Sequence, residues 1–357
     1  MSQRFVRVVR LFSQRGRSLM KLRFATLFTA LLVVFHTPAA FAEPLRFDLP
    51  VKCQMGVDCF VQNYVDIDPT KGKQDYQCGT LTYDNHKGTD IRVRSLREMD
   101  QGVAVVAGAD GVVANLRNGV EDHYFQTYSK AKQAEVKKIG LGNVVILKHR
   151  DGYTTAYAHM KKGSIRVKKG EHVKRGQLLG HIGLSGFTAF PHLHFAVRHK
   201  KIVIDPFSGP MASTPCDKTA KSLWSEAAAA ALNYQPSGFL LSGFASERPA
   251  GREEIETGRF GKSTLQADAP MLIFFSYLFG LHPGDLLHYT ITDPDGKIIA
   301  KAKGKKVANA KAVYMNYIGK RRPKSGWRPG KYLGEARLTR GGEIQRHSAT
   351  VEIAPRQ

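Results

Sequence analysis

Short apolar runs separated by glycine dominate the chain from residue 78 to residue 207. Several of them alternate apolar and polar residues, which is the period-two pattern of a half-buried β-strand, and the glycines between them indicate turns. The runs expected to form strands are 103–106, 111–115, 143–148, 153–159, 177–182 and 192–198. This pattern predicts a mostly β protein that begins with a compact antiparallel domain of the barrel-sandwich-like kind.

One segment in this region does not follow the strand pattern. Residues 121–139 are rich in Lys, Gln and Ala, and this composition predicts either an inserted helix or a mobile loop. Because the segment falls between two expected strands, it need not disturb the sheet.

The pattern changes after Pro206. Asp217 is a candidate N-cap for a helix that runs through Lys221, Trp224 and the alanine-rich residues 227–231. Short apolar runs then return at 271–278, 286–292, 297–301, 330–338 and 348–353, separated by turn signals such as Asp293-Pro294-Asp295-Gly296. Regular short strands of this kind favour a smaller β-sandwich of the immunoglobulin-like type.

These changes predict the domain organisation. Residues 43–216 would form the first β domain together with a Cys-containing amino-terminal segment, residues 217–235 a helical linker, and residues 236–357 the β-sandwich. The length of 357 residues agrees with two or three domains.

The first 42 residues have the three parts of a secretory signal peptide. Residues 1–23 carry seven basic and no acidic side chains, residues 24–35 are apolar, and Ala40-Phe41-Ala42 provides small residues for cleavage after Ala42. The apolar stretch is short for a transmembrane helix, which needs about 20 residues. A cleaved signal peptide is therefore favoured, and an uncleaved membrane anchor is the alternative. Translation from Met20 would give a more typical signal. The segment predicts export to the periplasm or cell envelope.

The cysteines agree with export. All four follow the predicted cleavage site, and an even count in an oxidising compartment favours two disulfides. Cys53 with Cys59 is the local pairing that we expect, and it leaves Cys78 with Cys216. A structural zinc site is the alternative, but the chain has no paired C-x-x-C spacing.

The charge of the chain is strongly positive. Lys and Arg exceed Asp and Glu by 54 − 30 = +24, and removal of the signal segment leaves +24 − 7 = +17. Such a charge predicts a polyanionic partner, or peripheral contact with an anionic envelope. No helix-turn-helix, zinc finger or aromatic-basic pattern is present, so we do not expect nucleic acid to be the partner. The basic clusters 301–306 and 320–322 are either polyanion contacts or solvated faces.

Three stretches that contain histidine carry the candidate chemistry. In an extended segment, His86, Gly88 and Asp90 share one face, and the glycine leaves room for an ion. His159 ends an alternating strand and is expected to point the same way as Tyr157.

The third stretch is Pro191-His192-Leu193-His194-Phe195. On a strand, His192 and His194 face one side while Leu193 and Phe195 enter the core. The three stretches together supply two imidazoles and a carboxylate for a zinc site with an open fourth position, and two further imidazoles close by. The other histidines of the chain follow no such pattern.

These stretches carry a resemblance to a known family. His86–Asp90, Tyr157–Met160, residues 167–180 and Pro191–Phe195, in this order, resemble the lysostaphin/LytM-type zinc endopeptidases of bacterial cell walls, over about residues 78–207. The resemblance implies the duplicated hybrid motif fold of that family. It also implies one zinc ion bound by His86, Asp90 and His194, with His159 and His192 as the catalytic pair.

The resemblance predicts zinc-dependent hydrolysis of peptide bonds in peptidoglycan. Zinc would lower the pKa of a bound water to about 7. One of His159 and His192 would accept the proton of this water, and the other would support the oxyanion or the leaving amine. The sequence leaves these two roles open.

Other functions are weighed against this one. Residues 167–182 also resemble the hairpin repeats of biotinyl or lipoyl carrier domains, although export and the three histidine stretches speak against a carrier. A non-catalytic envelope protein that binds anionic wall polymer or activates another wall hydrolase is the alternative function. We expect the region 239–353, which has no ligand set, to be a binding or targeting module that is dispensable for chemistry.

Overall fold

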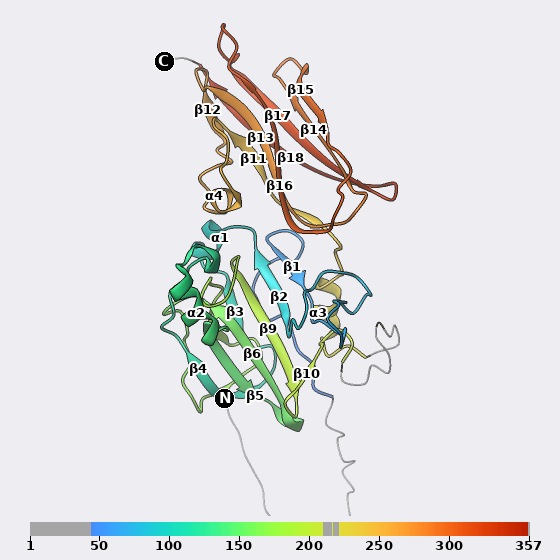
Figure 1. The fold of residues 1–357 in the computed structure, drawn as a ribbon. Helices are drawn as coiled ribbons and strands as arrows, with labels where there is room; N and C mark the ends of the chain where they lie inside the picture. Colours follow the sequence, from blue (N-terminus) through green and yellow to red (C-terminus); the bar gives the residue numbers. More distant parts are fainter. Residues whose placement is uncertain (1–43, 210–215, 217–220, 356–357) are drawn as a thin grey trace, which may run out of the picture. The chain divides into compact units, whose positions relative to one another are not determined.

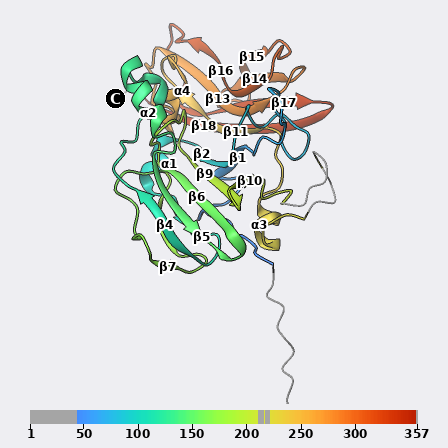
Figure 2. The same cartoon turned by 60° about the horizontal axis from the view of Figure 1, so that its bottom comes forward.

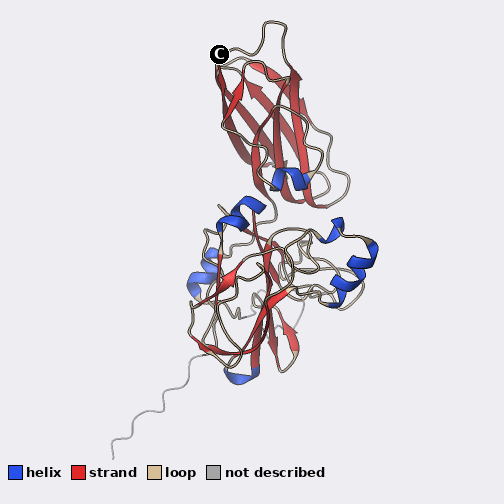
Figure 3. Cartoon of the chain, turned by 90° about the vertical axis from the view of Figure 1, so that its left-hand side faces the viewer, coloured by secondary structure: helices blue, strands red, loops and turns tan. Residues whose placement is uncertain are grey.

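The computed structural model describes residues 44–209, 216 and 221–355, and the expected signal segment and Asp217 lie outside this part of the chain. Strands prevail over helices throughout the described residues (Figure 3). The mostly β fold predicted from the short apolar runs is therefore confirmed. Among the described residues, no helix is both long and apolar enough to span a membrane.

One large sheet organises the first half of the described chain. Its strands follow the order β1-β2-β9-β6-β5-β4-β7, β10 pairs with β9, and every pairing is antiparallel. Figures 1 and 2 show β2, β9, β6 and β5 as its central strands. The strands are β1 (Cys59–Asn63), β2 (Thr89–Val93), β4 (Gly111–Arg117), β5 (Asn143–Lys148), β6 (Tyr153–Met160), β7 (His172–Val173), β9 (His192–His199) and β10 (Ile202–Ile204). A second, two-stranded sheet joins β3 (Ala104–Val106) to β8 (Leu178–His181).

The core of this half lies on one face of the large sheet. Leu193, Phe195 and Val197 alternate along β9 and are fully buried. The ring of Phe195 packs against the rings of Tyr157 and Trp224, with centroid distances of 5.3 and 5.4 Å. The side chains between them, His192 and His194, therefore emerge on the other face, as the alternation along the strand predicts.

Short helices connect the strands. They are α1 (Leu96–Gln101), α2 (Lys130–Lys138), α3 (Glu226–Ala231) and α4 (Arg252–Glu256), with the 3-10 turns η1 (Phe125–Thr127) and η2 (Arg150–Gly152). Of the two structures expected for residues 121–139, the helix is observed, and the hydroxyl of Ser129 caps α2 by accepting from the Lys132 N–H.

The helix expected from Asp217 onwards is shorter than predicted. It begins at Glu226, where the hydroxyl of Ser225 accepts from the Ala228 N–H. The described residues 221–225 are not helical, because the Phe47 N–H donates to the Leu223 carbonyl and the Ser225 N–H donates to the Phe47 carbonyl. Pairing with a distant segment thus takes backbone groups that a longer helix would have used.

The second half of the chain contains two further sheets. One has the order β11-β13-β16 and the other β12-β18-β17-β14-β15. Residues of both sheets, among them Phe274 on β13 and Tyr289 on β14, share one buried core, while an immunoglobulin-like topology remains a prediction. The strands are β11 (Gly238–Ala245), β12 (Thr264–Gln266), β13 (Met271–Leu281), β14 (Leu286–Thr292), β15 (Ile298–Lys303), β16 (Lys311–Arg321), β17 (Gly330–Arg340) and β18 (Glu343–Ala354).

Both expected disulfides are present. Cys53 is bonded to Cys59, and Cys78 is bonded to Cys216 across 138 residues of sequence. The alternative of a structural zinc site made by these cysteines is therefore wrong. The predicted domain boundaries stay a proposal, because a third apolar cluster joins Phe60 on β1 to Phe279 and other residues of the second half.

Candidate active site

Five predicted site residues converge at one end of the large sheet. In the sheet register, Asp90 on β2 lies opposite His194 on β9, and Ala158 on β6 lies opposite His194 from the other side. This pairing brings strands that are about a hundred residues apart in sequence into direct contact. The side chains are all at most 8% exposed: His86, Asp90, His159, His192 and His194.

His86, Asp90 and His194 point their polar atoms at one another. His86 Nε2 is 3.1 Å from Asp90 Oδ1 and 3.2 Å from His194 Nδ1, and His194 Nδ1 is 2.8 Å from Asp90 Oδ1. Two ligand atoms of a tetrahedral zinc site, each 2.0–2.1 Å from the ion, lie about 3.3 Å apart. The three atoms thus have nearly the spacing of zinc ligands, and they form one of the groups able to hold a metal ion.

The surroundings of His86 and Asp90 orient both side chains. His86 Nδ1 donates to the Tyr64 carbonyl oxygen over 2.6 Å, and the amide of Asn63 donates to Asp90 Oδ2 over 2.9 Å. The Nε2 lone pair of His86 therefore faces a carboxylate oxygen, an arrangement that a proton or a metal cation stabilises. Asn63 and Tyr64 were not expected from the sequence, since nothing in it links this segment to residues 86–90.

Gly88 has a different role from the one predicted. We expected it to leave room for an ion, but the imidazole of His194 takes that space. A Cβ at position 88 would lie 2.6 Å from His194 Cε1 and Nε2 and 3.0 Å from the Phe195 carbonyl oxygen. The glycine is thus needed for the close approach of the ring. His86 also precedes β2, so residues 86–90 are not one extended segment as expected.

His159 lies on the site only because its strand bulges. Tyr157 packs in the core against Phe195, whereas the His159 ring lies 4.7 Å from the ring of His192. The expectation that Tyr157 and His159 point the same way is therefore wrong. The register between β5 and β6 shifts next to His159, and this residue has a φ of 59°. Bulges re-aim side chains next to active sites, and a left-handed non-glycine residue costs about 1–3 kcal/mol.

Each of the two remaining histidines has one ring nitrogen engaged by the backbone. His159 Nδ1 donates to the Ser185 carbonyl over 2.8 Å, and His192 Nδ1 donates to the Phe190 carbonyl over 2.9 Å. The hydroxyl of Thr188 also lies 3.1 Å from His192 Nδ1. Both rings are therefore held by Nδ1, and Nε2 of each ring is directed into the site, where it can exchange a proton. His192 Nε2 lies 3.4 Å from Asp90 Oδ1.

Burial and mutual charge set the pKa values. Burial raises the pKa of Asp90, but the adjacent His86 and His192 outweigh it and hold this pKa well below its ordinary value. Burial and the neighbours His192 and His194 hold the pKa of His159 well below the ordinary value of imidazole. Burial also lowers the pKa of His194. A carboxylate and neutral imidazoles are the forms that metal binding and proton acceptance require.

His86 differs from the other histidines. Burial lowers its pKa, but the charge of Asp90 and the hydrogen bond to it outweigh burial, so the net pKa is raised. The carboxylate thus favours a positive charge at this point of the site. Two imidazoles and a carboxylate are a donor set typical of catalytic zinc sites, in which a fourth position stays open.

Comparison with known proteins agrees with this site. Residues 84–206 match the model of peptidase family M23, and this segment contains His86, Asp90, His159, His192 and His194. The chain therefore contains a domain of peptidase family M23, which confirms the resemblance seen in the sequence.

Proteins that are named for different activities are similar to parts of this chain. The chain is 34% identical over 131 residues to the peptidoglycan DD-endopeptidase ShyA of Vibrio cholerae, covering 36% of this chain and 24% of that protein. It is 32% identical over 138 residues to the murein hydrolase activator NlpD of Escherichia coli, covering 39% of this chain and 29% of that protein. The catalytic domain of lysostaphin from Staphylococcus simulans aligns with a TM-score of 0.25 and 26% identity, over 34% of this chain and 77% of that one. The chain thus spans less than a third of either curated relative.

Proposed function

We propose that this protein is an exported zinc endopeptidase that hydrolyses peptide bonds in bacterial peptidoglycan. The observation that carries the proposal is the buried group of His86, Asp90 and His194, whose polar atoms lie 2.8–3.2 Å apart beside two further histidines held by Nδ1. His86 Nε2, Asp90 Oδ1 and His194 Nδ1 would hold the ion. Zinc bound there supplies a Lewis acid that polarises a carbonyl group and lowers the pKa of water.

The residues of the chain perform the remaining work. Asn63 and the Tyr64 carbonyl keep Asp90 and His86 oriented, since outer partners of metal ligands fix the ring and carboxylate directions. His159 and His192 exchange protons at Nε2 with the attacking water and the leaving amine, because Nδ1 of each ring is occupied by a carbonyl.

Peptidoglycan is the substrate class that the relatives and the charge support. ShyA is named a peptidoglycan endopeptidase, and a charge of +17 after signal removal suits an anionic wall polymer. The proposed place of action, the periplasm or cell envelope, rests on the signal pattern of residues 1–42 and on two disulfides.

Activation of another wall hydrolase is the second candidate, because the match to NlpD is about as strong as the match to ShyA. A protein that only activates has no need of two oriented histidines beside a complete ligand set. The complete group of five buried residues therefore favours hydrolysis over activation.

One experiment separates the two functions. Purified zinc-loaded protein is incubated with isolated peptidoglycan, with and without a murein hydrolase, and the released fragments are identified by mass spectrometry. We expect new peptide ends from the protein alone and none from His86→Ala. Release that occurs only when the hydrolase is added, and that survives His86→Ala, would establish activation in place of hydrolysis.

A further inference from the structure

The carboxylate of Glu256 on α4 is buried against the first half of the chain. Its Oε1 accepts from Arg92 Nη2 over 2.8 Å, and its Oε2 accepts from the Tyr124 hydroxyl over 2.5 Å. The side chains of Arg92 and Glu256 both have 0% exposure. Charges almost never enter a protein interior without a partner, so each of these two groups depends on the other.

Arg92 connects this ion pair to the candidate active site. It lies on β2 two residues after Asp90 and opposite His192 in the register with β9. Its guanidinium stacks over the ring of Phe190 at 4.8 Å, and the Phe190 ring lies 4.4 Å from the His192 ring. The Phe190 carbonyl also accepts from His192 Nδ1. A continuous set of contacts therefore runs from Glu256 to His192.

Tyr124 gives a second connection to the same histidine. It immediately precedes η1, in which the Phe125 N–H donates to the Thr188 carbonyl over 3.0 Å. The hydroxyl of Thr188 lies 3.1 Å from His192 Nδ1 and donates to the Phe190 carbonyl over 2.9 Å. One carboxylate thus holds both segments that border the His192 ring.

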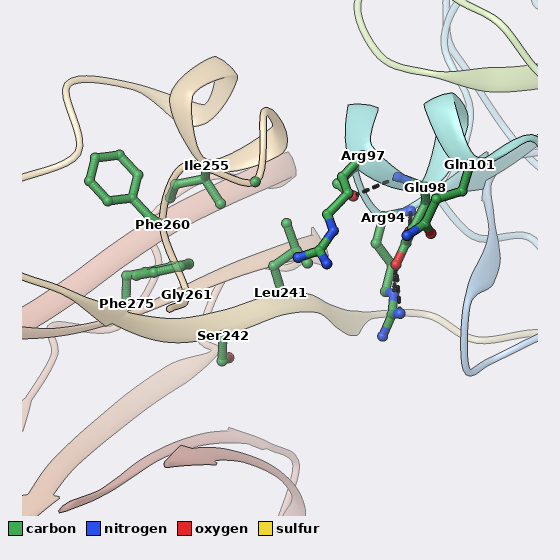
Figure 4. A pocket seen from close by; sticks show the side chains of 12 residues that line it. Arg94, Arg97, Glu98, Gln101, Leu241, Ser242, Ile255, Phe260, Gly261 and Phe275 are labelled. Atoms are coloured by element: carbon green, nitrogen blue, oxygen red, sulfur yellow. Dashed lines mark hydrogen bonds and ion pairs between the residues drawn. The ribbon is translucent and has the colours of Figure 1, made fainter. Parts of the chain in front are cut away.

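One side of α4 borders a cleft. This cleft of about 310 Å³ lies between Arg94, which precedes α1, the α1 side chains Arg97 and Glu98, and the apolar residues Leu241 and Phe260 (Figure 4). Solvent can enter there, although Ile255 of α4 is only 1% exposed and shares the third apolar cluster with Phe60 on β1. Apolar packing therefore helps to hold α4, and the buried ion pair is the contact that connects α4 to β2.

We propose that Glu256 is a positioning residue that sets the orientation of His192 through Arg92 and Phe190 and through Tyr124 and Thr188. The region after residue 236 is then required for efficient turnover, in contrast to the dispensable module expected from the sequence. The inference rests on the proposed function for its kinetic test, whereas the contacts between Glu256 and His192 are independent of that function.

The test compares Glu256→Gln with Glu254→Gln in the full zinc-loaded chain. Glu254 is a matched control because it lies on the same helix and its side chain contacts only Arg259 and the Ala250 N–H. We expect Glu256→Gln to keep its zinc and its fold, to lower kcat at least 10-fold and to change KM less than twofold. Glu254→Gln should match the wild type.

Two further measurements separate positioning from a general loss of stability. Phe190→Leu should lower kcat by a similar factor. The kcat of the double variant with Glu256→Gln should be no lower than that of the less active single variant, because both substitutions act on one set of contacts. In protein labelled with ¹⁵N-histidine, the ring signals of His192, assigned by their loss in His192→Gln, should shift in Glu256→Gln and not in Glu254→Gln.

The inference is overturned if Glu256→Gln keeps kcat within twofold of the wild type, if its His192 signals do not move, or if the two losses multiply. A wild-type protein without hydrolytic activity would defeat the proposed function, and the histidine signals would still test the positioning. If Glu256→Gln does not fold, Tyr124→Phe takes its place, because it removes only one hydrogen bond to Glu256. Its kcat and His192 signals are then compared with those of the wild type and of Phe190→Leu in the same way.

Discussion

At the scale of single residues, the site depends on two positions that break local rules. Gly88 provides the space into which the His194 ring fits, and His159 adopts a left-handed conformation at a bulge. Both cost conformational free energy in isolation. The surrounding sheet supplies the contacts that keep them in place, as is usual where chemistry needs a side chain in a direction that a regular strand does not offer.

The division between ligands and catalytic residues makes the first prediction. Replacing His86, Asp90 or His194 by Ala should remove zinc and activity together. Replacing His159 or His192 by Ala should leave the zinc and slow hydrolysis by roughly 10²- to 10⁴-fold, the usual contribution of a general acid or base. Zinc content and peptidoglycan hydrolysis are measured on the same folded variants. Complete zinc loss in His159→Ala and His192→Ala would contradict the division.

Gly88→Ala makes the second prediction. The added methyl group would lie 2.6 Å from two atoms of the His194 ring and close to backbone, so the ring must move and zinc affinity should fall. Gly119→Ala is the matched control, since nothing lies within 4 Å of a Cβ at that position. Competition with a zinc chelator measures both affinities, and equal values for the two variants would show that the approach of His194 to Gly88 is unimportant.

Asp205 makes a prediction about pH. Burial, with a smaller contribution from Asp75, raises the pKa of Asp205 from 3.8 to about 7. Between these values the folded protein holds a proton that the unfolded chain has lost, so this group lowers the free energy of unfolding as pH rises, by up to about 1.4 kcal/mol per pH unit. Its stabilising contribution is complete below pH 3.8 and lost as the pH passes 7.

The measurement is urea unfolding from pH 4 to pH 8 for the wild type and Asp205→Asn. The difference in unfolding free energy between the two proteins should change with pH in the direction given, because Asn does not titrate. A difference that is constant with pH would mean that Asp205 titrates normally in the folded state.

At the scale of elements, strand pairing supplies the outer contacts of the site. β1 pairs with β2 in a register that places Asn63 opposite Asp90, and this pairing is what allows the amide to reach the carboxylate. The disulfide from Cys53 to Cys59 closes the turn just before β1. A strand without any candidate ligand thus orients a candidate ligand on its neighbour.

Asn63→Ala tests this arrangement. Loss of the 2.9 Å hydrogen bond should weaken zinc binding by about 10- to 100-fold, the usual effect of removing an outer partner, while the fold is kept. Asn115→Ala on the exposed part of β4 is the control. Zinc titration followed by calorimetry distinguishes the two, and unchanged affinity in Asn63→Ala would remove Asn63 from the site.

At the scale of the whole molecule, the second disulfide joins parts of the chain that are far apart. All five candidate site residues lie between the two cysteines of this bond, Cys78 and Cys216. Cross-links that close long loops restrict the unfolded chain more than those that close short loops. This bond should therefore contribute more to stability than the bond between Cys53 and Cys59, which are six residues apart.

The comparison uses two double-serine variants. In the chain-entropy model, loss of the long loop lowers the free energy of unfolding by about 5 kcal/mol and loss of the short one by about 2 kcal/mol. Urea unfolding under oxidising conditions, with the wild type in reductant as a third arm, measures the difference. Equal destabilisation by the two variants would show that loop length does not govern the effect.

The sequence by itself determined several of the strands and drew attention to the five candidate site residues, which the structure brings together. The alternating run at 286–292 became the half-buried strand β14, and the continuous apolar run at 143–148 became the mostly buried strand β5, each with the predicted bounds. The three histidine stretches were equally readable, since few other patterns combine His and Asp at such spacings. Both disulfides followed from the count and spacing of four cysteines.

Only the tertiary structure decided how those parts act together. The direction of the His159 side chain depends on the bulge between β5 and β6, and Gly88 is needed because the His194 ring on β9 packs against it. Asp90 is oriented by Asn63, and Glu256 binds the arginine that contacts the segment next to His192. Each of these contacts joins residues that lie far apart along the chain. Local propensity and periodicity describe a residue and its near neighbours, whereas sheet register and buried pairing arise only when distant segments pack, and so they were not readable in advance.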